Sequence, residues 1–338
     1  MRKRWIGIGV LVMAMVVLMG WRWNWQIPFA SQPIADRPAQ AVPQAAPQAI
    51  APPLVNGQRL LADVEALSFV RFEERDRQQA RQYIEQSLQA AGWQPEALPY
   101  EGGGINIYAE RPGTDPAAGS ILLGAHYDTV ERSPGADDNA TSVATVLETA
   151  RLLAQQPTPR TLKLILFDQE EIGLVGSKAF VDQLNQGDER DRFKGAVILD
   201  MLGYACDTAG CQSYPSVLPI EPPTDRGNFL AVIGDQGHPE LVQSFTQPTS
   251  SPTAELSLPQ VLTLSIPTLG EFTPDLVRSD HAPFWKKGFG AVLVTDTANF
   301  RNPHYHQPSD TAATLVPDFF TGSAQRVVNA VTTLLTEM

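Results

Sequence analysis

The sequence predicts a three-layer α/β fold, in which a mostly parallel, mixed β-sheet carries helices on both faces. Short apolar runs at 121–125, 162–167 and 196–200 have the length of strands that are buried on both faces. Segments with helical apolar spacing lie between or after them, at 143–153 and 176–184. Strands that alternate with helices form mostly parallel sheets covered on both sides. Such sheets bind their ligands at the carboxyl ends of the strands.

Further segments extend this alternation on both sides of the three central strands. Helical spacing predicts helices at Glu73–Ala91 and Phe319–Leu335. Strand patterns occur at Ile105–Glu110, Phe229–Ile233 and Ala291–Thr295. No internal repeat is visible, so we expect one large α/β domain rather than a repeat protein.

Two segments precede this domain, which we place at residues 54–338. Residues 1–26 combine a basic start with a long apolar run, the pattern of a signal peptide or a signal anchor. No good A-x-A cleavage site follows, so we favour an uncleaved anchor. Residues 27–53 are rich in Pro, Ala and Gln and are interpreted as a semi-extended linker. We therefore expect an exported protein that meets the membrane only through its N-terminal segment, or a secreted protein if that segment is cleaved.

The net charge and the cysteines indicate which kinds of partner the protein can bind and in which compartment it works. The net charge of -12 argues against nucleic acid as a partner. Only two cysteines occur, Cys206 and Cys211, close together in one predicted loop. In an exported domain such a pair is best interpreted as a local disulfide, the alternative being two free thiols.

The segment 120–139 holds the first candidate metal ligands. Its strand leads into His126, Asp128 follows two residues later, and a loop rich in Gly and Pro brings Asp137 and Asp138. Ligands on a rigid strand end keep their geometry, and the loop can fold back to place another one, so the pattern suits a metal site. The alternative is an acidic surface turn with a solvated histidine.

Carboxylates also follow the other two central strands. Glu170 and Glu171 come shortly after the strand at 162–167, and Asp200 ends the strand at 196–200. Two adjacent buried carboxylates are costly without partners, so one can bind metal while its neighbour faces the substrate as a base. The alternative is a helix N terminus enriched in acidic residues by the helix dipole.

The five histidines of the chain supply the remaining candidates. His304 and His306 lie in a Pro-containing loop, and His238 is interpreted as a surface residue. His281 either supports the site from behind the ligands or fills the core. The chain contains no H-E-x-x-H and no G-x-S-x-G, which excludes a helix-borne zinc protease site and the usual serine nucleophile elbow.

Five short motifs occur in one order along the chain: AHYD at 125–128, GADDNATS at 135–142, FDQEEIGLVGS at 167–177, LDMLGY at 199–204 and YHQPSDT at 305–311. Together they resemble the family of co-catalytic di-zinc exopeptidases. That family includes bacterial leucyl aminopeptidases and glutamate carboxypeptidase, with glutaminyl cyclases as close relatives. The resemblance extends from residue 60 to the end of the chain, and it implies a zinc exopeptidase fold.

The resemblance implies two Zn²⁺ ions and assigns a ligand set to them. His126 and Asp200 match the ligands of one ion, and Glu171 and His306 match those of the other. Asp138 matches the carboxylate that bridges both ions. The H-x-x-x-D-T continuation is what selects His306, because the other histidine of that loop lacks it.

The resemblance also implies roles in catalysis for three more residues. Glu170 matches the general base, and Asp128 matches the carboxylate that orients His126. Tyr305 stands where some family members use a tyrosine to stabilise the tetrahedral intermediate. The implied activity is that of an aminopeptidase, which removes N-terminal residues from peptides with a water activated by two metal ions.

Two other functions remain open at this stage. The segment SDHAPF at 279–284 resembles an acidic segment of glutaminyl cyclases, so a glutaminyl-peptide cyclotransferase on the same scaffold is the nearest alternative. The residues Gly173–Ser177 favour the peptidase, as does Tyr305, because cyclases usually carry tryptophan at that position. A catalytically inactive interaction domain is the third alternative. We expect the loops at 203–226 and 268–289 to build the substrate pocket.

Overall fold

The computed structural model describes residues 50–186, 189–218, 221–247, 256–266 and 274–337. They belong to one compact unit that runs from Ala49 to Met338. The predicted signal segment at 1–26 and most of the predicted linker at 27–53 lie outside the described residues. Within the described ranges, no helix is both long enough and apolar enough to cross a membrane.

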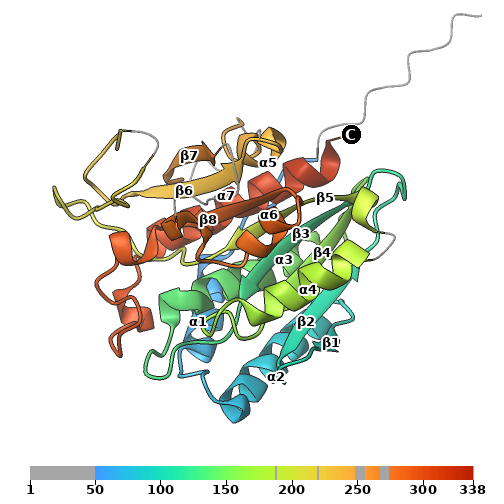
Figure 1. Ribbon diagram of the computed structural model, residues 1–338, viewed down its shortest axis with the longest axis horizontal. Helices are drawn as coiled ribbons and strands as arrows, with labels where there is room; N and C mark the ends of the chain where they lie inside the picture. The colour runs from blue at the N-terminus through green and yellow to red at the C-terminus, as the bar shows by residue number, and fades with distance from the viewer. Residues whose placement is uncertain (1–49, 187–188, 219–220, 248–255, 267–273, 338) are drawn as a thin grey trace, which may run out of the picture. The chain divides into compact units, whose positions relative to one another are not determined.

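An eight-stranded mixed sheet forms the centre of this unit (Figure 1), with the strand order β1-β2-β4-β3-β5-β8-β6-β7. The strands β4, β3, β5 and β8 form a parallel centre. On one side β2 and β1 continue antiparallel, and on the other β6 joins β8 antiparallel and carries β7 parallel to itself. The prediction of a mostly parallel, mixed sheet is therefore confirmed. The bounds are β1 Glu96–Pro99, β2 Ile105–Arg111, β3 Ser120–His126, β4 Thr161–Phe167, β5 Phe193–Leu199, β6 Phe229–Asp235, β7 Gln260–Ile266 and β8 Ala291–Thr295.

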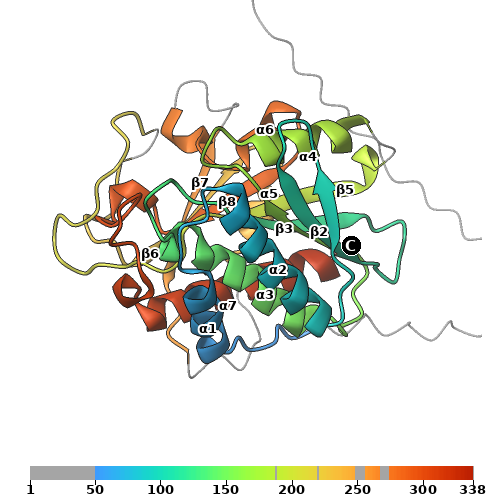
Figure 2. The same ribbon diagram turned by 90° about the horizontal axis from the view of Figure 1, so that it is seen from below.

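Helices cover both faces of the sheet. Figure 2 shows α4 and α6 on one side and α1, α2, α3 and α7 on the other. The helices are α1 Gly57–Leu67, α2 Glu74–Ala90, α3 Ser142–Leu153, α4 Val175–Gln186, α5 Pro239–Gln243, α6 Ala282–Lys286 and α7 Pro317–Thr336. This is the three-layer arrangement that the sequence predicts.

The central strands are apolar along their whole length because they contribute to two cores at once. In β3, Leu123 packs with Val146 of α3 and Val327 of α7 in the core of one face. Its neighbour Leu122 packs in the core of the other face, together with Phe284 of α6. Successive side chains of a strand point to opposite faces, so a strand between two helical layers needs apolar residues at every position.

The predicted elements are all present, and the structure adds five helices and strands that were not predicted from the sequence. These are α1, β1, β7 and the short helices α5 and α6. The strand β7 contains exposed and half-buried residues and only one buried residue, Ile266, so it lacks the continuous apolar run that marks the central strands. Helix α1 has a readable signal, since Leu60, Val64 and Leu67 are buried on one face and Asn56 caps its first turn.

Candidate metal centre

Three neighbouring parallel strands bring the candidate ligands to one edge of the sheet. β3 lies between β4 and β5, so the carboxyl ends of all three strands meet there. His126 is the last residue of β3, and Asp200 directly follows β5. β4 ends at Phe167, and Glu171 lies in the turn that follows, as expected from its distance along the sequence from the strand.

The first group of potential ligands consists of His126, Asp200 and Glu170. Each offers one ligand atom, and these atoms all lie within 4.8 Å of one another. Nε2 of His126 is 3.8 Å from Oδ1 of Asp200. His126 and Glu170 are buried, with 1% and 8% of their surface exposed. A buried imidazole and two carboxylates at this spacing can hold a cation between them.

The second group consists of Asp138, Glu171 and His306, again with their ligand atoms within 4.8 Å of one another. Nε2 of His306 lies 3.0 Å from Oε2 of Glu171 and 3.1 Å from Oδ2 of Asp138. His306 comes from the loop before α7, whereas Glu171 comes from the turn after β4. The chain thus closes the site from a segment that is distant in sequence.

Asp138 links the two groups. Its Oδ1 lies 3.4 Å from Nε2 of His126, while its Oδ2 lies 3.1 Å from Nε2 of His306. Each oxygen of the carboxylate therefore faces a different imidazole. Asp137, the neighbouring candidate, faces away, because its two oxygens accept hydrogen bonds from the backbone N–H of Gly203 at 2.8 Å and from Nδ2 of Asn302 at 2.7 Å.

Asp128 supports both groups from behind. Its Oδ1 lies 3.4 Å from Nδ1 of His126, the ring nitrogen that faces away from the ligand cluster. The same carboxylate accepts hydrogen bonds from the backbone N–H groups of Glu170 and Glu171, each at 3.1 Å. One buried carboxylate thus lies against the ring of a ligand and holds the turn that carries two more potential ligands.

The backbone near the ligands adopts an unusual conformation at three positions. Gln169, Met201 and His306 have φ angles of 58°, 60° and 58°, in the left-handed region. This region costs a residue other than glycine about 1–2 kcal/mol, so it persists only where surrounding contacts hold it. Gln169 precedes the two glutamates, Met201 follows Asp200, and His306 is itself a candidate ligand.

The ligand cluster contains more carboxylates than imidazoles, so a bound cation would be favourable there. Burial raises the pKa of Glu170 well above its usual value and that of Glu171 to about 7. Burial lowers the pKa of His306, but its contacts with Asp138 and Glu171 outweigh this and raise it to about 10. Four carboxylates, counting Asp200, thus share two imidazoles. A divalent cation relieves this repulsion.

The donor set fits zinc. Zinc binds imidazole nitrogen and carboxylate oxygen, and both groups contain one histidine together with carboxylates. Oε1 of Glu171 is buried and has no hydrogen-bond partner among the described residues. A buried carboxylate oxygen without a partner is costly, and a bound cation satisfies it.

Two residues that hold the site escaped the sequence analysis as functional residues. Arg71 is 1% exposed and ties the loop after β3 to the strand end. Its Nε donates to the carbonyl of Tyr127 at 2.7 Å, and its two terminal nitrogens donate to the carbonyls of Pro134 at 2.8 Å and Gly135 at 3.0 Å. The second residue is Asp310, whose carboxylate accepts hydrogen bonds from the backbone N–H groups of Asp137 and Asp138. Its position in the H-x-x-x-D-T motif was the available signal.

The other histidines lie outside the ligand cluster. Nε2 of His281 is 2.8 Å from the carbonyl oxygen of Leu276, and its ring packs edge-on against Trp285. His281 is thus a buried core residue, one of the two alternatives left open by the sequence. Its neighbour Asp280 is buried too, and both of its carboxylate oxygens have no hydrogen-bond partner within the described ranges.

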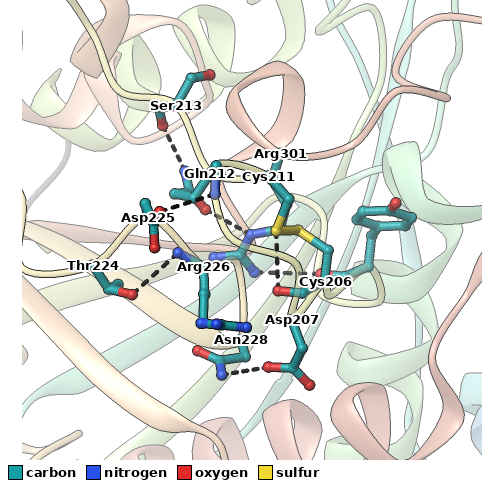
Figure 3. The surroundings of a disulfide bond; sticks show 12 residues. Cys206, Asp207, Cys211, Gln212, Ser213, Thr224, Asp225, Arg226, Asn228 and Arg301 are labelled. Atoms are coloured by element: carbon teal, nitrogen blue, oxygen red, sulfur yellow. Dashed lines mark hydrogen bonds between the residues drawn. A yellow bond between two sulfur atoms is a disulfide. The ribbon is translucent and has the colours of Figure 1, made fainter.

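The loop that follows the LDMLGY motif is closed by a disulfide. Cys206 and Cys211 are bonded, as predicted, and Figure 3 shows this bond beside the side chains of Gln212 and Arg301. Nε of Arg301 donates to Oε1 of Gln212 at 2.8 Å, and its guanidinium lies over the ring of Phe229. The disulfide and Arg301 together fix one wall of the space in front of the ligands.

A cavity of ≈ 690 Å³ opens in front of the ligand cluster. Its floor is an apolar face of the sheet, formed by side chains of β6, β7 and β8: Phe229, Ala231, Ile233, Leu262, Leu264 and Leu293. Its walls include residues of the two loops that the sequence analysis assigns to the substrate pocket: Gln212, Ser213, Tyr214, Leu218, Leu276 and Arg278. The cavity is large enough for several residues of an extended peptide.

Known proteins share both the sequence pattern and the fold. A model of Peptidase family M28 matches residues 106–331, more than half of the chain. The chain is 35% identical over 206 residues to the Uncharacterized protein YfbL of Escherichia coli (strain K12), an alignment that covers 58% of this chain and 62% of YfbL. This chain thus spans less than two thirds of that relative.

Solved structures extend the likeness in fold. An aminopeptidase from Aneurinibacillus sp. strain AM-1 is 18% identical, with a TM-score of 0.63, and the match covers 84% of this chain and 95% of the other. A glutaminyl cyclase from an Acidobacteriales bacterium is also 18% identical, with a TM-score of 0.59, covering 86% of this chain and 99% of the other. At this identity the likeness establishes the fold, and it is shared by a peptidase and a cyclase.

Proposed function

Because this chain belongs to Peptidase family M28, we propose that it is a zinc-dependent aminopeptidase that hydrolyses the N-terminal peptide bond of peptides. The observation that carries the proposal is the position of Asp138. Its two carboxylate oxygens face His126 and His306 separately, at 3.4 Å and 3.1 Å. A carboxylate shared between two imidazole-containing groups is what a centre for two metal ions requires.

Five residues would hold the two ions: His126, Asp200, Asp138, Glu171 and His306. When bound, zinc polarises the scissile carbonyl and lowers the pKa of water at the site. The carboxylate of Glu170 lies close to His126 and Asp200 in the first group, and Asp128 accepts a hydrogen bond from the backbone N–H of Glu170. We assign Glu170 as the general base, which accepts a proton from the attacking water and then delivers it to the leaving amine.

Tyr305 completes the proposed reaction on the other side of the site. Its ring stacks on that of His306, with centroids 3.8 Å apart, and it lines the same cavity as the ligands. Burial raises the pKa of Tyr305 above its usual value, which keeps the phenol protonated. A protonated phenol beside the scissile carbonyl can donate a hydrogen bond to the oxyanion that forms there.

The cavity supports peptides with an apolar N-terminal residue as substrates. The floor beside the ligands is formed by apolar side chains such as Ile233, Leu264 and Leu293, with no charged group among the floor residues. An apolar side chain that leaves water for this floor gains free energy in proportion to the area buried. We propose a preference for leucyl-type over lysyl or aspartyl N termini.

The glutaminyl cyclase alternative rests on Asp280 and on the shared fold. Asp280 lies in the segment that resembles a cyclase segment, and it is buried without a hydrogen-bond partner among the described residues.

One experiment separates the two functions: the purified protein is given a leucyl chromogenic substrate and a peptide with N-terminal glutamine, with and without a chelator. We expect chelator-sensitive release of the chromophore and no cyclisation. Cyclisation without hydrolysis would refute the peptidase assignment.

Export of the protein remains part of the proposal. The basic and apolar segment at 1–26 supports a signal anchor with the catalytic domain outside the cytoplasm. The disulfide between Cys206 and Cys211 agrees with this, because disulfides persist in oxidising compartments. Fractionation of the native host, with a protease-protection assay on intact cells, tests the location.

A further inference from the structure

Arg278 makes a direct contact with the tyrosine that stands beside the metal centre. Its Nη2 donates a hydrogen bond to the phenolic oxygen of Tyr305 at 3.0 Å. Tyr305 in turn stacks on the ring of His306 at an interplanar angle of 19°. Arg278 and Tyr305 both line the cavity in front of the ligands. The guanidinium therefore reaches the site through the tyrosine.

The guanidinium is held on its other side as well. Nη1 of Arg278 donates to Oδ1 of Asn299 at 3.0 Å and lies 3.8 Å from Oδ1 of Asp275. Asn299 belongs to a short 3-10 helix at Ala298–Phe300, which follows β8. A guanidinium has a planar set of donors in fixed directions. Anchored at Asn299, it can present Nη2 to Tyr305 in only a few orientations, although the side chain is 46% exposed.

The direction of this hydrogen bond determines what the phenol can do. An arginine only donates hydrogen bonds, whereas a phenol can both accept and donate one. Arg278 thus occupies an acceptor position of the Tyr305 oxygen and leaves the O–H to point elsewhere. Within the described part of the chain, this O–H has no hydrogen-bond acceptor. A hydroxyl group that accepts a hydrogen bond from a cationic group is also a stronger hydrogen-bond donor.

We propose that Arg278 is a positioning residue for hydrolysis: it orients the phenol of Tyr305 and directs its O–H to the oxyanion that forms at the scissile carbonyl. This inference rests on the proposed peptidase function and on the role of Tyr305 in it. Arg278 itself needs no contact with the substrate. The pair therefore acts as one unit, and the effects of removing either member should not be independent.

A double-mutant cycle on the zinc-loaded full-length protein tests this inference. The variants are Arg278→Gln, Tyr305→Phe and the double variant, assayed on a leucyl chromogenic substrate. We expect Tyr305→Phe to lower kcat by about 10²-fold, as for the loss of an oxyanion donor. Arg278→Gln should lower kcat by about tenfold with little change in KM, and the double variant should be no slower than Tyr305→Phe. Arg278→Lys, which keeps a donor but not the fork, should lie between wild type and Arg278→Gln.

A second readout does not depend on turnover. A leucine boronic acid forms a tetrahedral boronate that mimics the oxyanion, and calorimetry measures its affinity. Arg278→Gln and Tyr305→Phe should both weaken its binding, whereas binding of free leucine should not change. The matched control is Arg75→Gln, an exposed arginine on α2 that lies away from the cavity. Zinc content should equal that of wild type in every variant.

The outcomes separate this inference from the proposed function. Adding Arg278→Gln to the Tyr305→Phe variant could lower kcat by the same factor as adding it to wild type. In that case the two residues act independently and the inference is wrong. It is also wrong if Arg278→Gln raises KM alone, because the guanidinium then binds substrate directly. A zinc-loaded wild type that neither cleaves peptides nor binds the boronate refutes the proposed function, and the inference with it.

Discussion

The carboxylate of Asp310 holds the backbone of Asp138, with its Oδ2 accepting the N–H of Asp138 at 3.1 Å. Its Oδ1 accepts the N–H of the preceding residue, Asp137, at 2.9 Å. These two bonds fix the segment whose carboxylate faces both His126 and His306. Asp310 therefore sets the position of the Asp138 carboxylate, which we propose bridges two metal ions, without belonging to either ligand group.

Asp310→Asn should weaken metal binding while the protein stays folded. The asparagine keeps one acceptor oxygen but turns an NH₂ group toward a backbone N–H, so one of the two bonds is lost. Loss of such a supporting group typically lowers metal affinity about 10–100-fold. Competition with a chromophoric chelator measures the change, and Asp318→Asn, at an exposed position in the first turn of α7, is the control. Equal affinities in wild type and Asp310→Asn would contradict the role.

The wild-type protein should carry close to two zinc ions per chain. Asp138→Asn should reduce the content of both ions, because its two oxygens serve the two groups separately. His306→Ala should chiefly remove the ion of the second group and leave the other largely in place. Elemental analysis after gel filtration measures each content. Loss of a single ion in Asp138→Asn, with the other retained at full occupancy, would show that this carboxylate does not bridge.

The sequence predicts the parts of the site that sit on the central strands. His126 and Asp200 are recognisable because each follows an apolar run long enough for a buried strand. The fold class follows from the same runs. Five motifs in one order add the ligands on turns and loops, Glu171 and His306, which no periodicity places beside a strand end.

The supporting contacts could not be predicted in the same way. The side chain of Arg71 donates to five backbone carbonyl groups, and every residue carries such a group, so the sequence shows no partner for it. The bond from Asp138 to Asp310 spans 172 residues. Arg278 has two such partners, Asn299 and Tyr305. They likewise come into contact with Arg278 only after β8 and the loop that follows it have folded. Such contacts depend on tertiary structure rather than on local pattern.

The disulfide should be complete in the native protein and should support the cavity wall. Thiol titration of the denatured, unreduced protein is expected to find no free thiol. Replacing both Cys206 and Cys211 by serine opens a short loop, with a sequence separation of 5, and should lower the free energy of unfolding by about 2 kcal/mol by the loop-entropy estimate. Because Gln212 and Tyr214 line the cavity just after this loop, KM should also rise. Two titratable thiols would contradict the prediction.

His281 should make the metal-free protein less stable in acid. Burial lowers the pKa of His281 to about 4, below the 6.5 of an unfolded chain, and its Nε2–H faces the carbonyl of Leu276. The folded state thus favours the neutral ring, so this stabilisation is complete above pH 6.5 and is lost as the pH falls from 6.5 to 4. The loss approaches about 3 kcal/mol at 1.4 kcal/mol per pKa unit.

Urea unfolding in the presence of a chelator, at several pH values, tests the prediction for His281. His281→Gln keeps a donor for Leu276 but does not titrate in this range. It should be less stable than wild type at pH 7.5, and the difference should narrow toward pH 4.5. Parallel stability curves for the two proteins would show that His281 does not titrate in the predicted window.

Glu170 and Glu171 should differ in function although they are adjacent. Asp128 holds both through their backbone N–H groups, so changes in either side chain leave these bonds intact and should not unfold the turn. Glu171 faces His306 at 3.0 Å, whereas the carboxylate of Glu170 lies with His126 and Asp200. Glu170→Gln should keep zinc and lower kcat by about 10²–10⁴-fold, as expected for loss of a general base. Glu171→Gln should lose zinc together with activity. Zinc content and kcat, measured on the same preparations, decide between the two roles. If Glu170→Gln loses the metal while Glu171→Gln retains it, the two assignments are reversed. Unchanged hydrolysis in both variants would refute the proposed site.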